Sequence, residues 1–169
     1  MAIGWGKPRI FVKNLKQSNA KWMEVPTPAE GTTQLTPTKG DKKEAKLEGG
    51  SNEDVVFGRN NYELVYGIRV ADNKTMPIQH DEGIVADEYA VALQPENPNV
   101  PGFIIDRSRV SVEDPWSSEE GGVWTYTHDA LAPDAGKKVK WGKIAVTGDA
   151  NTGFTITGTG DDFTAATAE

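Results

Sequence analysis

The most regular hydrophobic pattern in the chain lies at residues 62–70. Five large apolar residues stand there at every second position, and Glu63 and Arg69 point to the other side of the alternation; the five are Tyr62, Leu64, Tyr66, Ile68 and Val70. A period of two predicts a β-strand with one buried face. This segment is therefore the clearest predicted strand.

Other short apolar runs, separated by glycine and proline clusters, predict further strands. They cover residues 10–15, 20–25, 89–93, 103–112, 123–128 and 139–146. The run at 103–112 is apolar in its first half and alternating in its second. We expect residues 123–128 and 139–146 to form an antiparallel pair, with Trp124 and Trp141 facing each other across it. The one predicted helix is short and covers residues 75–88, with Pro77 and Gly83 limiting it to one or two turns.

Residues 26–50 have a different character, with two proline-rich turns followed by a charged run that stops at Gly49 and Gly50. Lysine and glutamate alternate at Lys42, Glu44, Lys46 and Glu48, while Ala45 and Leu47 share the other parity. The pattern predicts a long polar hairpin that buries little of itself. Such a hairpin lies either in water or against another subunit.

Together these elements predict an all-β fold with minor α content, an antiparallel β-sandwich or half-barrel with one short helix and a long protruding hairpin. One domain spans residues 1–147. Residues 148–169 are rich in Gly, Thr, Ala and Asp, which predicts a C-terminal arm or a loosely ordered tail. Several strands offer few apolar residues, so their edges are expected to pair with another copy of the chain.

Composition narrows the classes of function. The net charge of −7 disfavours a duplex-binding protein, and the absence of cysteine excludes disulfides, thiolate nucleophiles and cysteine metal sites. Charge is uneven, since residues 1–50 carry nine Lys/Arg against five Asp/Glu and residues 51–147 carry nine against sixteen. This asymmetry is either ordinary surface scatter or complementarity between identical subunits. No secretory signal or membrane span is predicted, so we expect a soluble protein made in the cytoplasm.

Candidate chemistry is sparse. His80 and His128 lack a recognisable nucleophile motif, and the run from His80 to Glu82 lacks the spacing of a zinc site. The segment 149–153 resembles the first half of a calcium loop but lacks its closing glutamate, which favours a glycine-rich turn. The acid pairs Asp87/Glu88 and Glu119/Glu120 fall in polar loops. We therefore predict no catalytic, cofactor-binding or metal-ligating residue and no enzyme activity.

Tryptophan offers an alternative class of function. The chain has five tryptophans that could line a sugar-binding face: Trp5, Trp22, Trp116, Trp124 and Trp141. Of these, Trp22, Trp124 and Trp141 fall in predicted strands and are candidates for the core. A β-sandwich binding module of the adhesin or carbohydrate-binding kind predicts exposed tryptophans on one face. A self-assembling subunit predicts buried ones.

The order of segments across most of residues 3–147 resembles the tail tube (major tail) proteins of long-tailed bacteriophages and the related tube proteins of contractile injection systems. The segments are GKPRIFVKNL, KWMEVPTPAEGTTQLTPTKGDKKEAKLEGG, NNYELVYGIRV, PGFIIDRSRVSVEDPWSSEEGGVWTYTHDAL and KKVKWGKIAV. Residues 148–169 fall outside the resemblance.

The resemblance implies a structural subunit that assembles into hexameric rings, stacked into a tube through which DNA passes without specific binding. Its implied partners are further copies of itself and the tape-measure, tail initiator and terminator proteins, and its implied location is the virion tail, after synthesis in the host cytoplasm. The hairpin at 26–50 would reach a neighbouring ring. Another virion structural component with the same sheets remains a further alternative.

Overall fold

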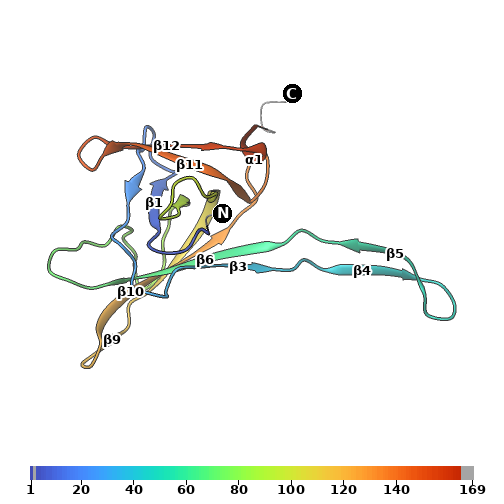
Figure 1. Cartoon of the computed structure of the whole chain (residues 1–169). Coiled ribbons are helices and arrows are strands. Elements are labelled where there is room, and N and C mark those ends of the chain that lie inside the picture. Colours follow the sequence, from blue (N-terminus) through green and yellow to red (C-terminus); the bar gives the residue numbers. More distant parts are fainter. Residues whose placement is uncertain (2, 165–169) are drawn as a thin grey trace.

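The computed structural model describes residues 1 and 3–164. Antiparallel strands dominate it, which confirms the all-β, sandwich-like prediction (Figure 1). The strands are β1 Arg9–Asn14, β2 Met23–Glu24, β3 Gln34–Thr38, β4 Lys42–Lys46, β5 Asn52–Phe57, β6 Asn61–Arg69, β7 Tyr89–Gln94, β8 Gly102–Glu113, β9 Trp116–Ser117, β10 Gly121–Ala130, β11 Val139–Asp149 and β12 Gly153–Thr159. A short helix, α1, covers Asp161–Thr164.

One large sheet runs in the order β2-β1-β7-β8-β10-β6-β3, with β11 also pairing with β8 and β12 pairing with β11. Strand β8 connects the two parts of the sheet because its two halves pair with different strands. Residues 102–105 pair with β11, whereas residues 108–113 pair with β10. The sheet therefore divides along β8 into two branches.

Strands β1 and β7 and the first half of β8 are buried on both faces, and so contribute to two hydrophobic cores. Ile10, Val91 and Ile105 point into the larger core with β6 and β10. On the other face Phe11 and Ile104 pack with Phe154 of β12 in a smaller core. Burial on both faces explains the continuous apolar runs of these strands. It also explains why β8 is apolar at first and alternates later: its second half has only one covered face.

The predicted helix at 75–88 is wrong. This segment contains a tight turn in which Asp81 and Ile84 form a bridge, and Glu82 and Gly83 both have positive φ (49° and 89°). Two successive residues with positive φ are typical of a type I′ turn and interrupt a right-handed helix. Ile78 is fully buried in the larger core, so packing fixes the segment in an irregular conformation.

The predicted pairing of residues 123–128 with 139–146 is also wrong. Strand β10 lies between β6 and β8, and β11 pairs with β8 and β12. Trp124 and Trp141 consequently do not face each other across one hairpin. The two strands follow one another along the same side of β8, which a pattern of alternation cannot distinguish from direct pairing.

The prediction of a loosely ordered tail after residue 147 is wrong for the described part. Strand β11 continues to Asp149 and forms a hairpin with β12, whose Phe154 packs edge-on against Phe11 with ring centroids 5.2 Å apart. In α1, Phe163 packs beside Gly142 and Gly158, where a side chain at either position would clash with its ring. Residues 165–169 lie outside the described residues.

Candidate interaction surface

The most distinctive feature of the surface is a ribbon, which we define as β4, β5 and the turn between them, residues 42–57. It projects from the body as a separate two-stranded sheet (Figure 1). The predicted hairpin at 26–50 thus supplies only one side of the projection; the returning side is β5, followed by the start of β6. At a rise of about 3.3 Å per residue, β4 and its turn extend roughly 25 Å beyond Asp41, where the ribbon leaves the body.

The ribbon turns at Glu48–Ser51. Leu47 N–H donates to Ser51 O (2.8 Å), and Gly49 and Gly50 both have positive φ (94° and 93°). Glycine populates this region without steric cost, so the predicted stop at these two glycines is confirmed. Along β4, the Lys46 Nζ lies 3.5 Å from Glu44 Oε2, and the Lys42 ammonium pairs with the same carboxylate.

At the root of the ribbon, two glycines let the strands approach closely. A Cβ added at Gly40 would lie 2.4 Å from the Gly58 carbonyl carbon, a distance that no side chain tolerates. Gly58 N–H donates to Asp41 O (2.6 Å), and the Gly40 N–H donates to the Asn60 side chain. These contacts fix how the ribbon leaves the body.

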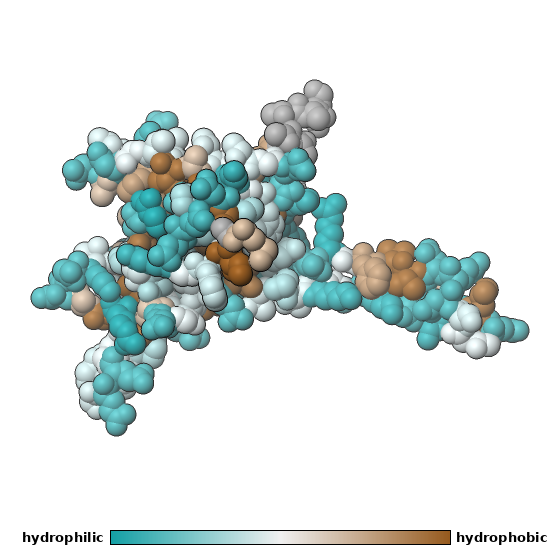
Figure 2. Space-filling model, viewed as in Figure 1, coloured by the Kyte–Doolittle hydropathy of each residue, from teal (hydrophilic) through white to brown (hydrophobic). Residues whose placement is uncertain are grey.

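Both faces of the ribbon carry apolar side chains that are about half exposed, and the Lys39 ammonium lies over the ring of one of them, Phe57. Cross-strand pairing places Phe57 opposite Lys42 on one face and Val56 opposite Lys43 on the other. Phe57 is 54% exposed, Val56 57% and Leu47 52%. Figure 2 shows this apolar surface in brown along the ribbon. A two-stranded hairpin is marginally stable in water on its own. We therefore regard the ribbon as a candidate surface for binding another chain.

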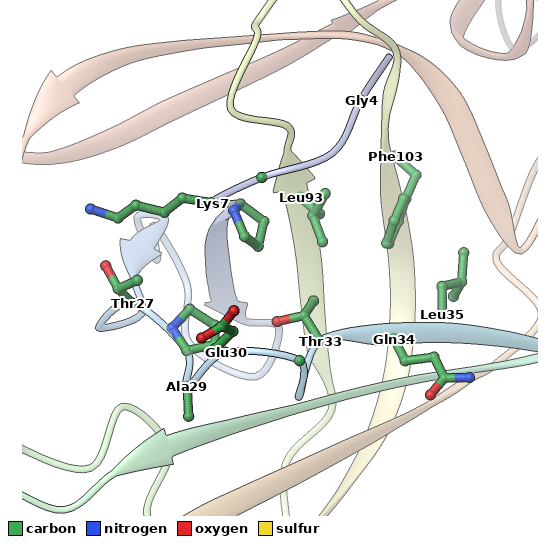
Figure 3. Close-up of a pocket in the computed structure, with 14 residues that line it drawn as sticks. Gly4, Lys7, Thr27, Ala29, Glu30, Thr33, Gln34, Leu35, Leu93 and Phe103 are labelled. Atoms are coloured by element: carbon green, nitrogen blue, oxygen red, sulfur yellow. The ribbon is translucent and has the colours of Figure 1, made fainter.

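A hollow of about 670 Å³ lies between the N-terminal segment and the loop before β3 (Figure 3). Leu35, Leu93 and Phe103 form its apolar wall, and Lys7 and Glu30 are the ionisable groups among the described residues that line it. In Figure 3 the Lys7 side chain extends away from Leu93 and Phe103. The hollow brings together no pair of groups suited to acid–base or nucleophilic catalysis.

His128 lies at the centre of the larger core, fully buried between Ser108 and Tyr66. Ser108 Oγ donates its proton to Tyr89 O (2.7 Å), so its contact with His128 Nδ1 (3.0 Å) has the imidazole as donor. The Tyr66 hydroxyl then donates to Nε2 (2.9 Å). Burial lowers the pKa of His128 to about 3 and raises that of Tyr66 well above its usual range. The serine–histidine contact is part of a polar network that is buried from solvent and hydrogen-bonded within the chain.

The other candidate residues have structural partners. His80 Nδ1 accepts a hydrogen bond from Gly83 N–H (2.8 Å) and so supports the turn at 81–84. Asp149 Oδ1 accepts from Asn151 N–H, Thr152 N–H and Thr152 Oγ, and these bonds, those from Thr152 foremost, lower the pKa of Asp149. The segment is a glycine-flanked turn. Among the described residues, no three or more His, Asp or Glu are grouped so that they could hold a metal ion.

The acid pairs lie at the surface in two different settings. Glu88 accepts two hydrogen bonds from Arg107 (2.9 and 3.0 Å), which lower its pKa, and Asp87 accepts one from Asn14 (3.0 Å). Glu119 and Glu120 are exposed at the turn between β9 and β10, where Glu120 N–H donates to Ser117 Oγ. The structure thus separates the two pairs, and neither forms an enclosed acid–base site.

The tryptophans divide into two groups. Trp22 and Trp124 are half-buried and pack against the smaller and the larger core, respectively. The other three are exposed and lie on different elements: Trp5 before β1, Trp116 on β9 and Trp141 on β11. The buried tryptophans expected of a self-assembling subunit are thus found at two of the five positions in the single chain.

No family model matches the chain, and no curated protein is significantly similar to it. No helix among the described residues is long and apolar enough to cross a membrane. The case for function therefore rests on the geometry of the surface. The alternating charges of β4 predict one strand of the ribbon. Val55 and Phe57 stand two residues apart in β5, and this apolar alternation, which lies outside the predicted strands, would have predicted the second strand.

Proposed function

We propose that the chain is a structural subunit of a bacteriophage tail tube, which assembles with copies of itself into stacked rings around a channel for DNA. The observation that carries the proposal is the ribbon. It exposes Leu47, Val56 and Phe57 on a two-stranded sheet whose outer edges are open among the described residues. Exposed edges and apolar faces of this kind are covered by other chains in natural assemblies.

Two further features support the same proposal. The net charge of −7 suits a conduit that lets DNA pass without binding it, because phosphates are repelled by acidic surfaces. The hollow of the body and the buried His128 network offer no arrangement of groups for catalysis. In the virion tail the subunit would contact further copies of itself, the tape-measure protein, and the initiator and terminator proteins at the two ends of the tube. A hexameric ring is the expected symmetry from the resemblance.

The experiment is a comparison of the full chain with a variant that lacks the ribbon. Because Lys42 and Phe57 are paired, residues 42–57 can be replaced by Asn-Gly, which closes the hairpin between Asp41 and Gly58. We expect the full chain to form rings or hollow tubes in negative-stain images and light scattering. The shortened chain should keep its β-sheet circular dichroism and remain small. Tubes formed equally well without the ribbon would contradict its role in assembly.

The exposed tryptophans favour a second candidate, a β-sandwich module that binds carbohydrate. Trp5 and Trp116 are 77% and 74% exposed, as ring-stacking residues for sugars would be. This function predicts a strict monomer at high concentration whose tryptophan fluorescence changes on addition of glycans. A tube subunit predicts concentration-dependent growth and no response to glycans.

A further inference from the structure

The ribbon has a basic, aromatic root, which we define as Lys39, Phe57, Arg59 and Lys138. The Lys39 ammonium lies 5.0 Å from the centre of the Phe57 ring, and Phe57 is 54% exposed. Lys138 Nζ donates to Asn60 O (3.1 Å) and Asn61 Oδ1 (3.0 Å), which brings a third cation to the root. Among the described residues, none of these three cations forms an ion pair with a carboxylate. The root thus combines a half-exposed aromatic ring, over which the Lys39 ammonium lies, with three cations that form no ion pair among the described residues.

The opposite character is found at the turn of β9 and β10, which we call the tip, residues 113–122. Trp116 at the tip is 74% exposed. Its backbone pairs with Gly122, and a Cβ added at Gly122 would lie 3.3 Å from Cδ1 of the Trp116 ring. The tip contains no lysine or arginine, and its acidic residues are Glu113, Asp114, Glu119 and Glu120. Tryptophan is enriched among the residues that contribute most to the affinity of protein–protein contacts.

The two surfaces lie at opposite ends of the body. In Figure 1 the tip extends to the lower left at β9, whereas the ribbon extends to the right. The tip of a chain therefore lies far from its own ribbon, and only another molecule can bring a tip to a root.

We propose that the tip of one copy docks on the ribbon root of the next, with Trp116 against Phe57 and the acidic rim facing Lys39, Arg59 and Lys138. This inference rests on the proposed function and names the surfaces that would join neighbouring subunits. Aromatic pairing contributes to the affinity, and the opposite charges set the orientation and the association rate. Because the two surfaces differ, the contact is heterologous and repeats from copy to copy, which closes a ring or extends a stack.

Charge complementarity within one chain is the reason to assign the occupant to a second copy. The cations at the root, which form no ion pair among the described residues, match an acidic tip of the same molecule, and both surfaces carry an exposed aromatic ring. The contact would also cover Trp116, one of the tryptophans that the isolated chain leaves exposed. A single docking event thus removes an exposed aromatic residue from each of the two surfaces.

A charge swap in trans tests the proposal. One variant reverses the tip (Glu119→Lys and Glu120→Lys), and the other reverses the root (Lys39→Glu and Arg59→Glu). Each variant alone places like charges in the contact, and we expect its association to weaken by about tenfold or more, because like charges across an interface are strongly unfavourable. An equimolar mixture of the two places opposite charges in every contact and should restore association to near the level of the unaltered chain.

The matched control changes the same amount of charge elsewhere, with Glu30→Lys and Asp134→Lys, which are exposed positions that belong to neither surface. It should assemble like the unaltered chain. Trp116→Ala should weaken association by about tenfold or more without changing the melting temperature, because the side chain is mostly exposed.

The outcomes separate the docking contact from the proposed function. If the unaltered chain forms tubes but the mixture of reversed variants stays apart, or each reversed variant assembles normally alone, the docking contact is wrong and the tube function stands. If the unaltered chain shows no association at any concentration in light scattering, both the docking contact and the tube function are overturned.

Discussion

Strand β8 and the ribbon show two opposite ways in which this chain uses β-structure. The first half of β8 is covered on both faces, with Phe103 and Ile105 in one core and Ile104 in the other. In the ribbon, every residue of β4 is exposed, and β5 has only Val55 half-buried. The same backbone hydrogen bonding therefore accompanies nearly complete burial in one place and almost none in the other.

The difference in burial indicates which interactions stabilise each region. In the body it comes from apolar burial within the chain, at about 25 cal/mol per Å². The ribbon has a two-glycine turn and the pairs of Lys42 and Lys46 with Glu44, and exposed ion pairs of this kind contribute about 0–1 kcal/mol. Stable order in the ribbon is thus expected to depend on another molecule, whereas the body contains two hydrophobic cores of its own.

The largest expected contrast between the two regions comes from truncating one side chain in each. Ile105→Ala should lower the free energy of unfolding by about 2–5 kcal/mol, because the residue is fully buried in the larger core. Val56→Ala should change it by less than about 0.5 kcal/mol, since Val56 is mostly exposed. Urea titration of both variants checks this. A comparable loss in Val56→Ala would mean that the ribbon folds as part of the core.

A second contrast lies in the response to pH. The pKa of His128 is lowered by burial to about 3 from an ordinary value of 6.5, so the unfolded chain binds a proton more readily than the folded one. Stability from the neutral imidazole is complete above pH 6.5 and is lost as pH falls from 6.5 toward 3. The expected slope is about 1.4 kcal/mol per pH unit within this window.

The measurement is urea unfolding between pH 6.5 and 4.5, above the range in which most carboxylates titrate. His128→Gln removes the titrating group and should flatten the slope, whatever its effect on absolute stability. A variant with the same slope as the unaltered chain would assign the pH dependence to other groups. Ribbon variants such as Val56→Ala should retain the slope of the unaltered chain, because the ribbon contains no histidine.

The sequence predicted where most strands lie better than it predicted which strands pair with one another. The alternation from Tyr62 to Ile68 marked β6 because one of its faces packs on the core, which is the condition that produces a period of two. The predicted pairing of β10 with β11 was wrong because β8 is long enough to pair with both strands along the same edge. The register of strand pairing that produces this arrangement is not visible in the alternation of apolar residues. The helix at 75–88 failed because core packing of Ile78 and the turn at Glu82 and Gly83 override a weak local preference.

The surface was predictable only in part, for similar reasons. Alternating charge in β4 indicated an exposed hairpin, and the stop at Gly49 and Gly50 was evident from composition. The basic root could not be predicted, because Lys138 is distant in sequence from Asn60 and meets it only through folding. The segment after residue 147 contains few apolar residues, which predicted that it would be loosely ordered. Phe154 nevertheless packs against Phe11 of β1, a contact between residues distant in the sequence.

A smaller effect is expected at the root of the ribbon. Gly40→Ala places a Cβ 2.4 Å from the Gly58 backbone, so the ribbon must shift relative to the body. We expect assembly to weaken, while the free energy of unfolding of the body changes by about 1 kcal/mol or less, because the clash can be relieved by moving the exposed ribbon. Gly58→Ala is the graded control, since its nearest contact is 3.1 Å. Equal effects of the two variants on assembly would show that the close approach at Gly40 does not direct the ribbon.

The smallest expected effect concerns the ion pairs along β4. Glu44→Gln removes the carboxylate shared by Lys42 and Lys46, and the free energy of unfolding of the whole chain should change by less than about 0.5 kcal/mol. Amide hydrogen exchange in β4 and β5 should nevertheless become faster in the monomer, because local opening of the ribbon is independent of the body. Exchange in β8 should be unchanged in the same sample. A variant that destabilises β8 and the ribbon together would mean that the two regions unfold as one unit, and the ribbon would then owe its order to the body rather than to a neighbouring copy.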